Sequence, residues 1–165
     1  MATAKLVKRV ELMHFLNTTP GGGSETWSRI GEGHPNLSTA YNAETDTQQW
    51  INQSVGTTTV KNYAPVISTE QTAYAGDEVF DFVDNLSWNL AVGSDAEAEY
   101  LEVRTYNAAG SPSEYPARKF RCSISIDSEG DAATDPVSRS YNINFMGDPV
   151  FGTFNPTTLT FTPTT

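Results

Sequence analysis

Cysteine and histidine are scarce in this chain, and their scarcity excludes two kinds of site. The sequence contains one cysteine, Cys122, and two histidines, His14 and His34, which lie far apart. A single cysteine excludes an intrachain disulfide and provides no thiolate cluster for zinc. Neither histidine has a second ligand at the spacing that metal sites use. The sequence therefore predicts no metal and no cofactor.

Positive charge is also scarce. Ten Lys and Arg residues stand against 20 Asp and Glu residues, which gives a net charge of -10 and a pI near 4.5. A chain this acidic repels phosphates, so its composition argues against a function in binding the phosphate backbone of nucleic acids. No run of about 18 apolar residues occurs, and the charged N-terminal segment does not resemble a signal peptide. We therefore expect a protein that is made in the cytoplasm and has no membrane segment.

One stretch has apolar residues at helical spacing, and we expect it to form an α-helix over residues 77–90. Asp77 is placed to cap its first turn, and Gly93 is placed to end it. The acidic residues of the stretch spread around the helix, which favours a structural helix over an acid/base cluster. The expected core stripe consists of Val79, Phe80, Val83, Leu86 and Leu90.

Most of the remaining chain alternates between apolar and polar residues, as strands do. Cys122 lies on the apolar side of one such strand, so we expect a buried thiol. A turn is predicted at residues 147–149 and a loose tail at residues 163–165. Strands are expected over residues 9–17, 64–73, 100–106, 119–127, 141–145, 150–154 and 159–162.

Residues 33–63 have few apolar residues for their length, and a hairpin within them is predicted around Val55. Loops longer than about 15 residues inside a compact domain are usually functional or ordered by a partner. Isolated exposed apolar side chains also call for a partner. We interpret the segment as an inter-subunit arm whose self-assembly residues are Tyr41, Asp46, Gln49, Trp50, Ile51 and Val55.

Enzyme chemistry has little support in the sequence. No nucleophile stands beside a base in any recognisable motif, so we expect no catalytic residues. Asp127, Glu129 and Asp131 loosely resemble the start of a calcium loop, but the distal glutamate and the flanking helices are missing. These observations favour a non-enzymatic protein without a cofactor.

Several short motifs, read in order, cover nearly the whole chain. They are ELMHFLN at residues 11–17, IGEG at 30–33, YNAETDTQQ at 41–49, YAGD at 74–77, GDPV at 147–150 and TFNPTT at 153–158. Together they resemble the major tail tube proteins of bacteriophages with long, non-contractile tails. The match is a composite of positions rather than a catalytic signature.

The resemblance implies a mainly β fold, a β-sandwich or half-barrel with one flanking helix, in a single tail-tube domain over residues 1–165. It implies hexameric rings that stack into a tube in the virion tail, through which the genome DNA passes without specific binding. Tail-tip, tape-measure and tail-terminator proteins are the implied partners. An alternative from another class is an immunoglobulin-like adhesion or carbohydrate-binding module that would use exposed Trp27, Trp50 and Tyr41 against sugars.

Overall fold

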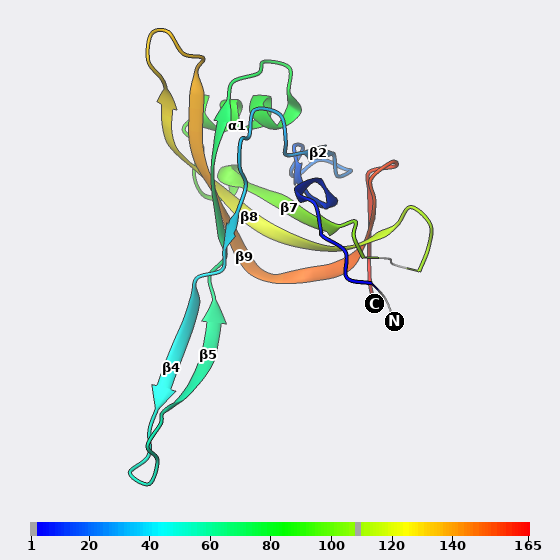
Figure 1. Ribbon diagram of the computed structural model, residues 1–165. Coiled ribbons are helices and arrows are strands. Elements are labelled where there is room, and N and C mark those ends of the chain that lie inside the picture. The colour runs from blue at the N-terminus through cyan, green and yellow to red at the C-terminus, as the bar shows by residue number, and fades with distance from the viewer. Residues whose placement is uncertain (1–2, 108–109) are drawn as a thin grey trace.

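The computed structural model describes residues 3–107 and 110–165 and shows a mainly β chain with one α-helix (Figure 1). The elements along the chain are η1 (Arg9–Glu11), β1 (Leu12–Asn17), β2 (Trp27–Arg29), β3 (Thr39–Ala40), β4 (Ala43–Gln48), β5 (Thr57–Tyr63), β6 (Val66–Thr72), α1 (Glu78–Trp88), η2 (Gly93–Ala96), β7 (Glu97–Arg104), β8 (Tyr115–Gly130), β9 (Ser138–Asn155) and β10 (Thr160–Pro163). The first expected strand is therefore shorter at its start, because residues 9–11 form a 3-10 turn.

One antiparallel sheet organises the body of the molecule. Its strand order is β2-β1-β7-β8-β9-β6-β3, and β10 pairs with the far part of β9. Strands β4 and β5 form a separate two-stranded sheet that projects from the body (Figure 1). The strands expected to form a sandwich or half-barrel thus belong to one continuous sheet.

The long strand β9 replaces the turn that the sequence predicts at residues 147–149. This 18-residue strand pairs with β8 on both sides of Gly147, which has a φ of +71°. The register shifts there, so that Met146 lies opposite Arg121 and Val150 lies opposite Lys119. Extra residues in one strand of an antiparallel pair bend the strand without ending it. The predicted turn is therefore wrong, and the segment is a bulge.

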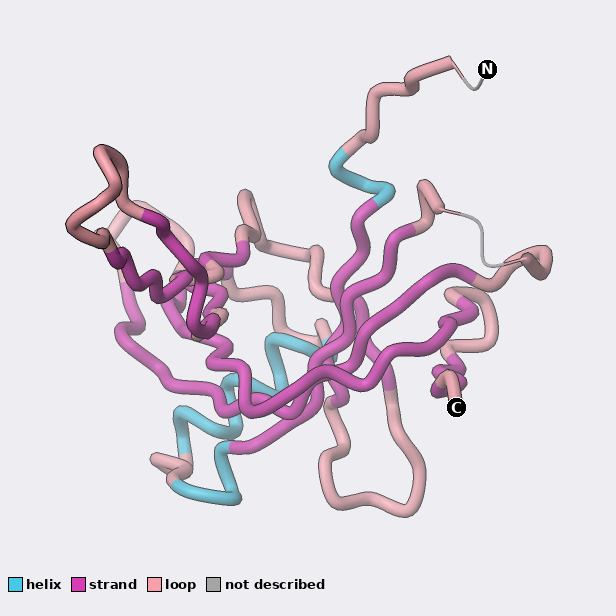
Figure 2. Tube along the Cα trace, turned by 90° about the horizontal axis from the view of Figure 1, so that it is seen from below, coloured by secondary structure: helices cyan, strands magenta, loops and turns pink. Residues whose placement is uncertain are grey.

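Helix α1 covers one face of the sheet (Figure 2). The Asp77 carboxylate accepts a hydrogen bond of 2.8 Å from the backbone N–H of Phe80, which is the N-cap that the sequence predicts. The buried stripe of the helix packs on apolar side chains of the strands, including Cys122, whose pKa burial raises to about 12. The buried helix residues are Val79, Phe80, Val83 and Leu86.

Leu90 is not part of that stripe, and the expectation that it lies in the core is wrong. The helix ends at Trp88, and Leu90 is 83% exposed with a φ of +49°. The N–H of Ala91 donates to the carbonyl of Leu86, and the N–H of Leu90 donates to the carbonyl of Ser87. This pair of bonds is a Schellman motif, which ends a helix at a left-handed residue. Leu90 takes that position, so the helix stops before it reaches Gly93.

The other face of the sheet carries a second core at the opposite end of the long strands. Phe15, Leu101, Val103 and Phe154 are buried there, with Trp27 beside them. The C-terminal residues take part in this region, because Pro163 lies in β10 and the N–H of residue 164 bonds to the carbonyl of residue 151 at 2.9 Å. The expectation of a loose tail over residues 163–165 is therefore wrong for all but the last residue.

Candidate self-assembly surface

The hairpin of β4 and β5, here called the arm, spans residues 43–63 and stands away from the body (Figure 1). Every residue of β5 is exposed, and β4 has one half-buried residue, Asp46. The two strands pair only with each other in the described part of the chain. An isolated two-stranded hairpin is at best marginally stable in water. The arm therefore lacks a core of its own.

The predicted arm begins ten residues too early. Residues 33–42 pack on the body, because Thr39–Ala40 pairs with β6 and Leu37 packs against the helix-side core. Gly33 has a φ of +76°, and a Cβ there would lie 2.4 Å from the carbonyl oxygen of Thr72. A glycine is needed at this close approach. The sequence did not show that this segment is tied to the sheet.

Short polar contacts fix the arm as a hairpin. The hydroxyls of Thr47 and Thr58 are hydrogen-bonded at 2.8 Å, and the Lys61 ammonium lies 4.0 Å from the Asp46 carboxylate. At the tip, the amide of Gln49 donates to the carbonyl of Gln53 at 2.9 Å. These exposed interactions contribute little each. They define the direction of the hairpin more than they stabilise it.

Three apolar side chains meet solvent at the end of the arm, here called the arm tip. Trp50 is 64% exposed, Val55 is 79% exposed and Ile51 is fully exposed. No charged residue occurs between Asp46 and Lys61. Burying such a side chain contributes roughly 1.5 to 3 kcal/mol. The arm tip is therefore the part of the arm that gains most from a partner.

Tyr41 lies in the body segment next to the base of the arm, far from the arm tip. Its hydroxyl accepts a hydrogen bond of 2.6 Å from the Arg118 guanidinium, which lies 5.7 Å from the centre of its ring. Arg118 also donates two hydrogen bonds of 3.1 Å to Glu102, a carboxylate that is almost fully buried. A charge-assisted, two-point contact of this kind has a defined geometry. The arm is thus tethered at its base to strands β7 and β8.

A buried histidine lies near this base. His14 is hydrogen-bonded through Nδ1 to the hydroxyl of Tyr100, and its Nε2 has no partner among the described residues. Burial lowers the pKa of His14 to about 4, and nearby Arg9 and Arg118 act in the same direction. The imidazole is therefore neutral at neutral pH. It is a structural side chain of the sheet.

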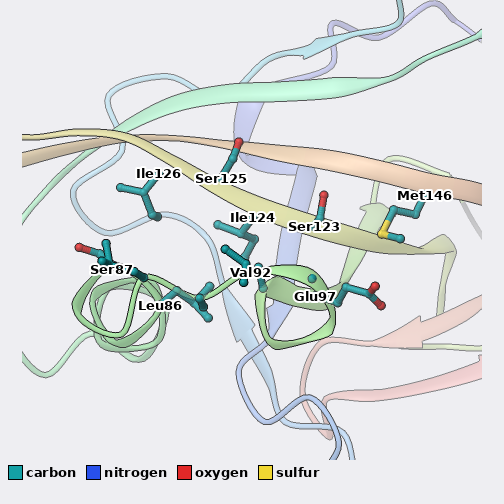
Figure 3. Close-up of a pocket in the computed structure, with 13 residues that line it drawn as sticks. Leu86, Ser87, Val92, Glu97, Ser123, Ile124, Ser125, Ile126 and Met146 are labelled. Carbon is teal, nitrogen blue, oxygen red and sulfur yellow. The ribbon is translucent and has the colours of Figure 1, made fainter.

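A second apolar surface lies beside the C-terminal end of α1, and the sequence analysis missed it. A groove runs between this end of the helix and β8, where Leu86, Val92, Ile124, Ile126 and Met146 line it (Figure 3). Leu90 lines it as well, and Trp88, 86% exposed, stands at the same end of the helix. The signal in the sequence was Trp88, which falls off the helical stripe and has no core role.

The geometry offers no support for the other kinds of site that the sequence raised. Within residues 3–107 and 110–165, no group of three or more His, Cys, Asp and Glu side chains is placed to hold a metal ion. No described helix is long and apolar enough to cross a membrane. Trp27 is only 2% exposed, so it cannot join Trp50 and Tyr41 in a sugar-stacking surface. The carbohydrate-binding alternative therefore loses one of its three residues.

Comparison with known proteins was informative only at the level of structure. No protein-family model matches the chain, and no curated protein matches it by sequence. A subunit from the tail of an empty GTA particle, solved with C6 symmetry, superimposes with a TM-score of 0.61 at 15% identity, covering 88% of this chain and 98% of that one. The sheath/tube terminator of the PVC extracellular contractile injection system gives a TM-score of 0.50 at 12% identity, covering 91% and 99%.

Both superpositions extend over nearly the whole of each chain, so they concern the complete fold and not one motif. At these identities they establish the fold alone. The mainly β fold with one helix that the sequence resemblance implied is confirmed, and the chain has the fold of tail-tube proteins.

Proposed function

We propose that this chain is a non-enzymatic structural subunit of a virion tail tube. Copies form hexameric rings, the rings stack, and DNA passes through the lumen during ejection. The observation that carries the proposal is the arm, an uncharged apolar tip held away from a body that has the tail-tube fold. A surface of this kind is maintained only if another chain covers it.

The sheet supports the same proposal. It ends at the short strand β2 on one side and at β3 and β10 on the other. Exposed strand edges invite pairing with another chain, and a ring whose subunits continue one another's sheets removes them. When rings stack head to tail, the upper surface of one ring contacts the lower surface of the next. The stack can always accept another ring, so contacts of this kind produce filaments.

The charge of the chain suits a conduit. A net charge of -10 gives the assembled wall no general attraction for phosphates, so DNA is not retained by it. The partners in this proposal are other copies of the chain within one domain over residues 1–165, and the tail-tip, tape-measure and tail-terminator proteins that begin, measure and end a tail. Assembly takes place in the cytoplasm of the host bacterium.

Electron microscopy of the purified protein tests the proposal. We expect hollow tubes or rings of uniform width that become more abundant with concentration and time, and light scattering that rises in parallel. A variant in which a short Gly/Ser linker replaces residues 43–62 is the control, and it should remain a folded monomer. A wild-type protein that stays monomeric at high concentration, even with tail-tip components added, would refute the proposal.

A further inference from the structure

The groove beside the C-terminal end of α1 has the character of a binding surface with an apolar floor. Its floor is formed by Leu86, Ile124 and Ile126, which lie between the end of the helix and β8 in Figure 3. Ser87 of the helix and Glu97 of β7 lie at its edge, so an apolar centre has a polar rim. This arrangement is typical of the surfaces that bury another protein's side chains.

Charge limits what can dock there. Among the residues that line the groove, only Glu97 is charged, and its carboxylate is paired with Arg121 at 2.7 Å. The chain as a whole carries a net charge of -10, so two copies repel each other over most of their surfaces. The arm tip is the complementary feature, because residues 47–60 carry no charge and expose Trp50, Ile51 and Val55.

Geometry excludes the arm tip of the same copy. The arm points away from the body, and α1 lies at the far end of the body from the tip (Figure 1). A tip that reaches a groove must therefore come from another molecule. Because the two surfaces lie at opposite ends, each copy presents one tip and one groove, and the contact repeats from copy to copy.

We infer that the groove between α1 and β8 receives the arm tip of a second copy of this chain. The inference rests on the proposed tail-tube function and names the surface that the arm contacts. Trp50 and Ile51 fill the groove against Leu90 and Val92. The groove is lined by 13 residues, fewer than the roughly 20–30 residues a side of a standard interface. A single contact is therefore weak, and only repetition along a tube makes it stable.

Disulfide trapping between two variants tests the pairing directly. Ile51→Cys and Val92→Cys proteins are mixed at high concentration under mild oxidation. Native Cys122 does not interfere, because it is fully buried and burial raises its pKa to about 12. We expect a mixed disulfide dimer from this pair. Asp135→Cys, in the exposed segment between β8 and β9, replaces Val92→Cys in the control mixture and should give at least about tenfold less.

The outcomes separate the inference from the proposed function. Tubes without the Ile51–Val92 disulfide, or equal trapping at Asp135, would refute the groove as the receiving surface and leave the tube function standing. A protein that forms neither tubes nor the disulfide would refute both.

A charge placed in the groove gives an independent measurement. Val92→Glu should raise the protein concentration needed for tubes by about tenfold or more, which corresponds to about 1.4 kcal/mol per contact. Val137→Glu is the matched control, since Val137 is also an exposed valine but lies outside the groove. It should change that concentration by less than about twofold. Equal effects of the two variants would show a general charge effect and overturn the inference.

Discussion

The body and the arm of this protein are built from similar strands but obtain their stability in opposite ways. In the body, strands β1 and β7 bury side chains on both faces, in the core under α1 and in the second apolar core. In the arm, β4 and β5 cover nothing, and the largest side chain, Trp50, faces solvent. The difference shows that strand patterning alone does not decide burial. What decides it is whether another layer packs against the strand.

The same contrast appears in the polar groups. The body pairs a buried cation with carboxylates: the Arg139 guanidinium lies 2.6 Å from the Asp84 carboxylate and 2.9 Å from the Glu129 carboxylate. Asp84, which lies on the helix away from the apolar stripe, is thus a partner of a buried cation rather than a free surface residue. The arm has only exposed polar contacts. Substitutions should therefore affect stability in the body and assembly in the arm.

The largest effect is expected from a charge in the helix stripe. Val83→Asp places an unpaired carboxylate against the core, and it should lower the free energy of unfolding by about 3 to 5 kcal/mol. Trp88→Asp, on the exposed side of the same helix, is the control and should cost less than about 1 kcal/mol. Thermal melts check the ranking. A reversed order would mean that the described helix face is wrong.

An intermediate effect is expected from pH. The pKa of His14 is about 4 in the folded protein, below the ordinary 6.5 of the unfolded chain. As the pH falls, the unfolded state binds the proton first, so stability decreases between about pH 6.5 and pH 4 and the loss is complete below that range. The shift corresponds to about 3 kcal/mol. Burial also lowers the pKa of His34, so protonation of this side chain destabilises the fold as well.

Denaturant unfolding at a series of pH values measures this dependence. His14→Gln should flatten the profile between pH 6.5 and 4, and a His34→Gln protein should retain the contribution of His14. An unchanged slope in the His14 variant would show that the loss of stability in acid comes from other groups.

The smallest effect on the monomer is expected at the arm tip. Trp50→Ala should change the free energy of unfolding by less than about 0.5 kcal/mol, because this side chain contacts no core. It should nevertheless raise the protein concentration needed for tube formation. Trp27→Ala is the matched substitution in the body, where the side chain is 2% exposed, and it should cost about 3 to 5 kcal/mol. A Trp50→Ala monomer that melts far below the wild type would end the distinction between arm and body.

Much of the fold was predictable because local rules and the tertiary structure agree in the body. The Asp77 cap, the stripe from Val79 to Leu86 and the alternation of the strands depend on residues close together in sequence. The exposed residues of the arm tip were also predictable, since the segment has too few apolar residues to bury them. The residues that line the groove were not, because Leu90, Val92 and Ile126 come from different elements.

The sequence by itself determined the mainly β class, the helix and its cap, and the few apolar side chains that stay exposed in the arm, because each depends on spacing or composition. Only the tertiary structure decided that Gly147 marks a bulge instead of a turn, that residues 33–42 belong to the body, and that Leu90 leaves the core. These outcomes depend on which distant strand pairs with each segment and on which backbone N–H and C=O groups still need a hydrogen-bond partner. A linear pattern does not contain that information, because the pairing of distant segments is settled by the free energy of the whole packed chain.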